Sequence, residues 1–90
     1  MGFAVTGGVG NEVQEGDTSI YIKKVFDKGV AARFGGIEVG DQLHIVNGTR
    51  LIDVTHSFAI EALRNADDPV VLVLAKTARI NPLIFANYRR

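Results

Sequence analysis

The dipeptide Asn47-Gly48 constrains the fold of this chain more than any other feature of the sequence. Asparagine and glycine both tolerate positive φ, so the pair favours a two-residue hairpin turn. Residues 42–46 before it and residues 49–52 after it have the composition of short strands. The sequence therefore predicts an antiparallel hairpin in the second half of the chain.

Other stretches have the composition of strands, helices and loops. Residues 3–6 and 19–26 predict strands, and residues 70–75, which are apolar on both faces, predict a central, buried strand. Residues 30–34 predict a brief helical turn. Thr55 is a good N-cap for a helix over residues 56–65. The polar, glycine-rich residues 7–18 predict a mobile hairpin loop that does not pack.

The order of these elements predicts the fold class. It is strand, strand, small helix, strand, strand, larger helix and strand, followed by a tail. Five to six short strands with two α-helices favour a mostly β fold, a partly open β-sandwich or barrel that the helices cap. A chain of 90 residues makes one domain with a thin core.

Composition limits the partners that the chain can have. Ten basic and ten acidic residues cancel, so no nucleic-acid partner is expected. The absence of cysteine excludes disulfides and thiolate metal sites. The longest apolar run, residues 70–75, is far below the ~20 residues that span a bilayer, so no direct membrane insertion is expected. No signal peptide is visible, and a cytoplasmic location is the expectation.

The sequence offers little for catalysis. His44 and His56 are the only histidines, and no HExxH motif is present. Ser57 is adjacent to His56, and neighbours on a helix point about 100° apart, so the two do not meet as nucleophile and base. Residues 7–10 are glycine-rich, but neither a lysine nor a helix follows as in a phosphate loop. We therefore predict a binding module that is not an enzyme and uses no metal or cofactor.

Four segments resemble the motifs of PDZ domains. Met1-Gly2-Phe3 looks like the last three residues of the GLGF carboxylate loop, and residues 40–48 (GDQLHIVNG) are similar to the G-D-x-I/L-x-x-V-N-G segment. Residues 55–63 (THSFAIEAL) resemble the groove helix, and residues 29–32 (GVAA) the entry to the first helix. The resemblance implies a PDZ-like domain over residues 1–76 that binds the C-terminal residues of partner proteins by β-strand addition, in a scaffold or adaptor role.

The resemblance also assigns roles to individual residues. A glycine turn leaves backbone N–H groups without partners, so Met1, Gly2 and Phe3 would hold the carboxylate of the ligand. His56 would hydrogen-bond a Ser or Thr hydroxyl two residues before the terminus, the class I preference Ser/Thr-x-hydrophobic. Lys23 would contact an acidic residue at the fourth-from-last position of the ligand. The pocket for the terminal side chain would be lined by Met1, Phe3, Val5, Ile60 and Leu63, and the last two share a helical face with His56.

The tail, residues 77–90, departs from the PDZ pattern, as does the lack of a strand before the glycine loop. One hypothesis is that residues 83–86 form a strand that pairs with residues 70–75 and replaces the missing strand. The other hypothesis is that the tail is helical or has no fixed structure.

The expected partners are the C-termini of other proteins, such as membrane receptors, channels or signalling proteins, met at the inner face of a membrane. The alternative function is a structural dimerisation domain, which would pair through an exposed sheet edge and bind no peptide.

Overall fold

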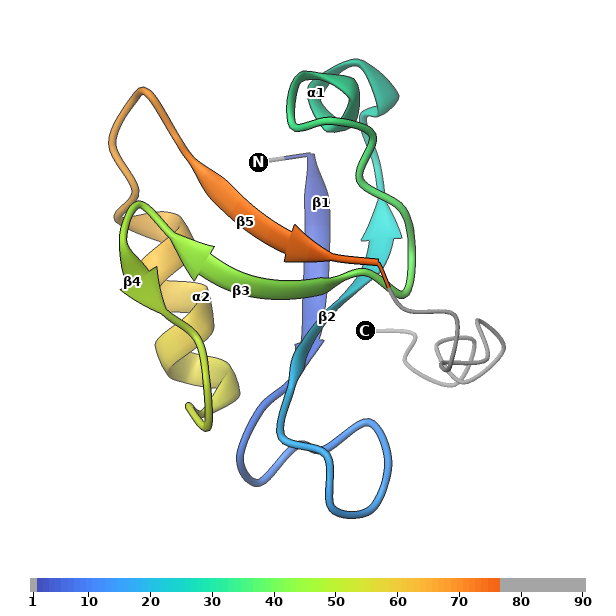
Figure 1. The fold of residues 1–90 in the computed structure, drawn as a ribbon, viewed down its shortest axis with the longest axis vertical. Helices are drawn as coiled ribbons and strands as arrows, with labels where there is room; N and C mark the ends of the chain where they lie inside the picture. Colours follow the sequence, from blue (N-terminus) through green and yellow to red (C-terminus); the bar gives the residue numbers. More distant parts are fainter. Residues whose placement is uncertain (1, 77–90) are drawn as a thin grey trace.

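The structure, a computed structural model, describes residues 2–76 (Figure 1). The predictions for Met1 and for the tail, residues 77–90, lie outside the described residues. Within them the chain forms five strands and two helices, in the order that the sequence predicts. The elements are β1 (Phe3–Gly7), β2 (Ile20–Val25), α1 (Lys28–Arg33), β3 (Gln42–Val46), β4 (Thr49–Arg50), α2 (His56–Arg64) and β5 (Leu72–Ala75).

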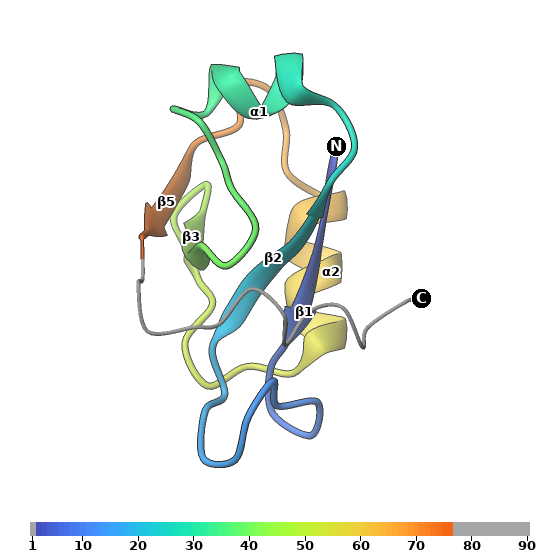
Figure 2. The same cartoon turned by 90° about the vertical axis from the view of Figure 1, so that its right-hand side faces the viewer.

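The strands form one open antiparallel sheet, which confirms the predicted mostly β fold class. β1 pairs with β2 and β2 with β3, while β3 also pairs with β4 and β5. Gln42 of β3 faces Tyr21 of β2 on one side and Ala75 of β5 on the other. β1 stands at the end of this order, so among the strands of residues 2–76 only β2 pairs with it. Its second edge is turned toward α2 (Figure 2).

The core collects side chains from β1, β2, β3 and both helices. Ala59 of α2 is completely buried, while Ile60 and Leu63 pack against the core and stay partly exposed. The helix therefore buries the small side chain of Ala59 in the core, while the larger side chains of Ile60 and Leu63 lie beside β1. The buried cluster consists of Phe3, Val5, Ile20, Ile22, Ala31, Ile37, Leu43, Val46, Leu51 and Ala59.

Side-chain caps set the starts of both helices. The Thr55 hydroxyl accepts a hydrogen bond from the Phe58 N–H at 3.1 Å, which confirms the predicted N-cap of α2. α1 begins at Lys28, earlier than predicted, because the Asp27 carboxylate accepts from the N–H groups of Gly29 and Val30. Neither helix, nor any other in residues 2–76, is long and apolar enough to cross a membrane.

The hairpin at Asn47-Gly48 forms as predicted, with φ of 47° at Asn47 and 82° at Gly48. Its second strand is shorter than expected, since β4 ends at Arg50. The chain bends at residues 52–53, where Asp53 takes a φ of 53°, and this bend ends the ladder.

The prediction of a central, buried strand at residues 70–75 is wrong. In the described part of the chain, β5 pairs with β3 alone. Val71 is 59% exposed and Val73 43%, whereas Leu72 and Leu74 pack against the core. An apolar run allows both faces of a strand to be buried. The second face is buried only if another part of the chain packs on it. The predicted partner, residues 83–86, lies outside the described residues.

The loop between β1 and β2 packs better than its composition suggests. Val13 is only 9% exposed, so the prediction that residues 7–18 do not pack is wrong there. The Val9 N–H donates to the Val54 carbonyl at 2.8 Å, and Val9 forms a parallel bridge with Thr55. These contacts tie the start of the loop to the segment that enters α2.

Lys76 anchors the connection between α1 and β3 to the end of β5. Its Nζ donates to Asp41 Oδ2 and to the Gly36 carbonyl, both at 2.8 Å, and lies 3.3 Å from Glu38 Oε1. The hydrogen bond to Asp41 raises the pKa of Lys76 above its ordinary value, and Glu38 adds to this effect. The connection is therefore held against the sheet.

Candidate functional site

A groove of about 680 Å³ runs between the outer edge of β1 and α2, and we call it the β1–α2 groove. Every predicted site residue within residues 2–76 lines it, except Gly2. The lining residues are Phe3, Ala4 and Val5 of β1, Lys23 of β2, His56, Ile60, Leu63 and Arg64 of α2, and Ala66, Asp68 and Val70 after the helix.

The two ends of the groove are set by the direction of α2. A Cβ atom added to Gly8 would lie 2.6 Å from the His56 backbone nitrogen, so α2 begins directly beside the end of β1. The helix then runs back along β1 toward the start of that strand (Figure 1). The groove consequently has Phe3 and Leu63 toward one end and His56 at the other.

His56 presents a single ring nitrogen to the groove. Its Nδ1 is buried and has no hydrogen-bond partner among the described residues. Because an unpaired buried N–H is unfavourable, the ring proton belongs on Nε2. Nε2 is then the nitrogen that can donate to a ligand in the groove.

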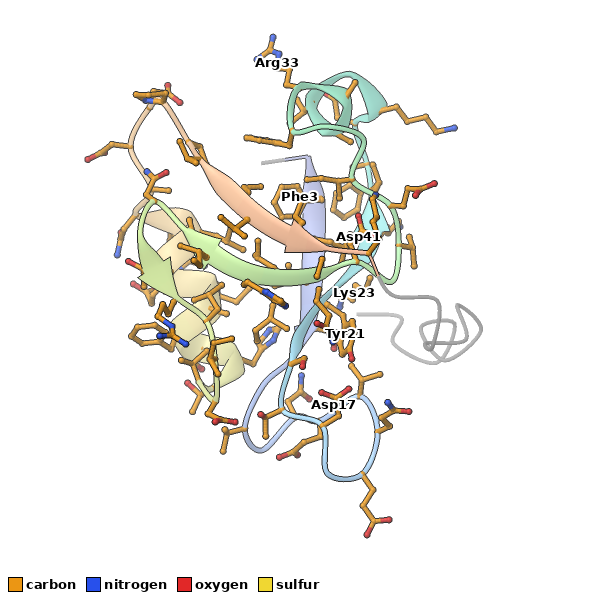
Figure 3. All side chains as sticks on the ribbon, in the orientation of Figure 1. Phe3, Asp17, Tyr21, Lys23, Arg33 and Asp41 are labelled. Carbon is orange, nitrogen blue, oxygen red and sulfur yellow. The ribbon has the colours of Figure 1, made fainter. Side chains whose placement is uncertain are left out.

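Lys23 reaches the groove from the neighbouring strand because of a β-bulge. Ala4 faces Lys24 and Val5 faces Ile22, so Lys23 is the extra residue of β2. A bulge changes the direction in which its side chain points. Figure 3 labels Lys23 on β2, and this residue lines the β1–α2 groove although it belongs to the second strand.

The start of β1 is fixed by hydrogen bonds to Gly2. The Gly2 carbonyl accepts from the N–H groups of Phe26 at 2.8 Å and Asp27 at 3.1 Å. These bonds hold the backbone where the sequence places the carboxylate loop. Gly2 itself does not line the groove, and Met1, the other member of that loop, is not described.

Five groove residues were not predicted from the sequence. Arg64 follows Ile60 by four residues, so helical spacing could have found it. Its guanidinium also bonds Glu61 Oε2 at 3.2 Å. Ala4 lies in β1 between Phe3 and Val5, two residues that were predicted. The other three carried no motif, and only the return of the chain after α2 places them at the groove. They are Ala66, Asp68 and Val70.

The groove offers binding groups and no metal centre. Among residues 2–76, no group of three or more His, Asp and Glu side chains gathers as a metal ion would require. The groove instead combines a strand edge, apolar walls, an imidazole nitrogen and an ammonium group. An extended peptide can add to such an edge as a further strand and place alternate side chains in the groove. Fold and site together define a peptide-recognition domain.

Comparison with known proteins identifies the family. The PDZ domain model matches residues 1–75, and the chain belongs to the PDZ family. Disks large homolog 3 of Mus musculus is 43% identical over 81 residues, which are 90% of this chain and 10% of that protein. Disks large homolog 2 of Rattus norvegicus is 44% identical over 80 residues, which are 89% of this chain and 9% of that protein. The chain thus spans about a tenth of the length of these relatives.

A solved structure supports the same assignment. The crystal structure of Dlg1 PDZ2 from the choanoflagellate Monosiga brevicollis superimposes with a TM-score of 0.77 and 37% identity, over 84% of each chain. PDZ domains bind C-terminal peptides of partner proteins by adding them as a strand to an exposed sheet edge. The chain is a protein–protein interaction module of this kind, and the alternative of a purely structural dimerisation domain is not favoured.

Proposed function

We propose that residues 1–76 bind C-termini of the form Ser/Thr-x-hydrophobic, as a strand added antiparallel to the outer edge of β1. The observation that supports this proposal is the β1–α2 groove, in which a β1 edge that no strand of residues 2–76 pairs with lies beside the imidazole of His56. Side chains of an added strand point alternately to opposite sides. The last and third-from-last side chains of the ligand therefore face α2.

The terminal carboxylate would lie at the start of β1, held by backbone N–H groups of Met1, Gly2 and Phe3. The last side chain would enter the apolar end of the groove, where burial of one aliphatic side chain contributes about 1.5–3 kcal/mol. The pocket for it would comprise Met1 and four residues that line the groove, namely Phe3, Val5, Ile60 and Leu63.

Titration of the domain with a labelled peptide ending Thr-x-Val tests this function directly. We expect saturable binding, and a loss of about thirtyfold or more when the terminal carboxylate is amidated, because charge-assisted hydrogen bonds are lost. The amides of Gly2 and Phe3 should shift in NMR spectra with the free acid. Equal affinity for acid and amide would refute the proposal. Self-association without peptide binding would instead revive the dimerisation alternative.

His56 would select the third-from-last residue of the ligand. With the proton on Nε2, the ring donates to the Ser or Thr hydroxyl oxygen. We expect His56→Ala to weaken binding of a Thr-x-Val peptide about tenfold and that of a Val-x-Val peptide about twofold or less. Isothermal titration of the four combinations gives the coupling energy.

Ser57→Ala is the matched control for His56→Ala, because Ser57 is exposed on the same helical turn and does not line the groove. It should leave both affinities unchanged. If His56→Ala weakens both peptides by the same factor, His56 does not read the hydroxyl.

Lys23 would contribute a preference for Glu or Asp at the fourth-from-last position. We expect the parent to prefer Glu over Lys there by about fivefold, and Lys23→Glu to abolish or invert this ratio. Lys24→Glu makes the same charge change on the neighbouring residue, which does not line the groove. A preference that survives in Lys23→Glu but not in Lys24→Glu would reassign the contact.

In this proposal the domain belongs to a scaffold or adaptor at the cytoplasmic face of a membrane. Its partners would be receptors, channels or signalling proteins with exposed C-termini. The binding event needs no catalysis, cofactor or metal. The similarity to the Dlg relatives supports this role.

A further inference from the structure

A second groove, of about 600 Å³, lies between β2, α1 and the connection from α1 to β3, and we call it the β2–α1 groove. Figure 2 shows these segments together on one face of the molecule. The connection is bonded to β2, since the Gly40 N–H donates to the Ile22 carbonyl and the Ile22 N–H to the Asp41 carbonyl, both at 2.8 Å. The groove is thus on the side of β2 away from β1.

The floor of the β2–α1 groove is apolar and concave. Ala31 is 4% exposed and Ile37 5%, and Val25 packs against the same core. A side chain from another molecule could contact these residues only by entering the groove. An apolar side chain that protrudes from a peptide can enter the groove in this way, with the rest of the peptide lying along the rim.

The rim of the groove is basic. Lys23, Lys24 and Lys28 all line it, and Glu38 is its only acidic lining residue. The Glu38 carboxylate lies 3.3 Å from the ammonium of Lys76, so a cation already stands beside it. The Lys24 ammonium also lies 5.1 Å from the centroid of the Phe26 ring.

We propose that the β2–α1 groove binds an acidic internal segment of a partner protein, which places one apolar side chain on the floor and carboxylates against the lysines. The charge of the rim and the apolar floor together specify this occupant. The site is separate from the β1–α2 groove, although Lys23 borders both grooves. Lys24 and Lys28 border only the second groove and therefore distinguish the two.

The probe is the blocked peptide acetyl-Glu-Asp-Leu-Phe-Asp-Glu-amide, which has no free carboxy terminus for the β1–α2 groove. Titrated into the ¹⁵N-labelled chain, it should shift the amides of Val25, Ala31 and Ile37 and leave those of Phe3 and His56 in place. The basic analogue acetyl-Lys-Lys-Leu-Phe-Lys-Lys-amide should bind at least about fivefold more weakly. Equal binding of the two peptides would overturn the proposal.

Two variants test the groove itself. Lys28→Glu reverses one rim charge at the first residue of α1, where an acidic residue suits the helix, and should weaken the acidic peptide about fivefold. Arg50→Glu, the same charge change in β4 outside the groove, should have no such effect. Ala32→Leu fills part of the groove from an exposed helical position and should also weaken the peptide.

The proposal fails if Lys28→Glu and Arg50→Glu bind the acidic peptide equally well. It also fails if the chain binds phosphatidylserine vesicles through Lys24 and Lys28 but not the acidic peptide, since the groove would then face a membrane. Binding of the Thr-x-Val peptide should be unchanged in Lys28→Glu and Ala32→Leu. Unchanged binding of that peptide would show that the β2–α1 groove acts independently of the β1–α2 groove.

Discussion

Gly7→Ala should lower the free energy of unfolding by about 3 kcal/mol, the largest stability loss we expect from a change of one methyl group in this domain. Gly7 has a φ of 95°, and a Cβ atom there would collide with the Ser19 carbonyl oxygen. That oxygen belongs to the backbone just before β2, so it cannot move without disturbing the β1–β2 ladder. Thermal unfolding should show a midpoint lowered by roughly 12–24 °C.

Gly10→Ala is the control that separates backbone strain from collision. Gly10 has a φ of 84°, and a Cβ atom there would meet nothing within 4 Å. This variant should lose only about 1 kcal/mol, the strain of the left-handed conformation. If the two variants unfold at the same temperature, the close approach to Ser19 does not constrain the fold.

Gly8→Ala should reduce affinity for a C-terminal peptide by more than about tenfold, the largest functional effect of a residue that need not touch the ligand. Its Cβ atom would lie 2.6 Å from the His56 nitrogen and 2.9 Å from the Val54 carbonyl oxygen. The start of α2 must therefore move away from β1, which displaces His56 and changes the width of the groove. Isothermal titration with the Thr-x-Val peptide measures the loss below the unfolding transition.

Gly7→Ala is the comparison for Gly8→Ala, because the two added methyl groups would strike opposite neighbours. The collision at Gly7 involves the segment before β2, whereas that at Gly8 involves the segment that starts α2. Below its unfolding transition, the Gly7→Ala variant should therefore keep most of its affinity for the C-terminal peptide. If Gly8→Ala binds as tightly as Gly7→Ala, this contact does not set the geometry of the groove.

The elements whose signals act over a few residues were predictable. Asn47-Gly48 adopts the positive φ values that its turn requires, and the Thr55 hydroxyl bonds the Phe58 N–H. Both features, the turn conformation and the capping hydrogen bond, involve residues that are close in sequence, so the local residue types decide them. Helical spacing likewise placed His56, Ile60 and Leu63 on one face, and all three line the β1–α2 groove.

Features that depend on distant segments were not predictable in the same way. Residues 70–75 are apolar throughout, yet Val73 is 43% exposed. A second face of a strand is buried only where another layer from elsewhere in the chain packs on it. The bulge at Lys23 is also invisible in the alternation of β2. It arises from the register against β1, which is a property of two strands and not of one.

The sequence by itself determined the order of strands and helices, the hairpin, the cap of α2 and the helical face that borders the groove. These depend on backbone preferences and side-chain spacing within a few residues. Only the tertiary structure decided that Gly8 touches the start of α2, that a β-bulge lies at Lys23, and that a basic second groove lies beyond β2. The physical reason is that packing and strand register bring together residues far apart in the chain, and local preferences contain no record of those partners.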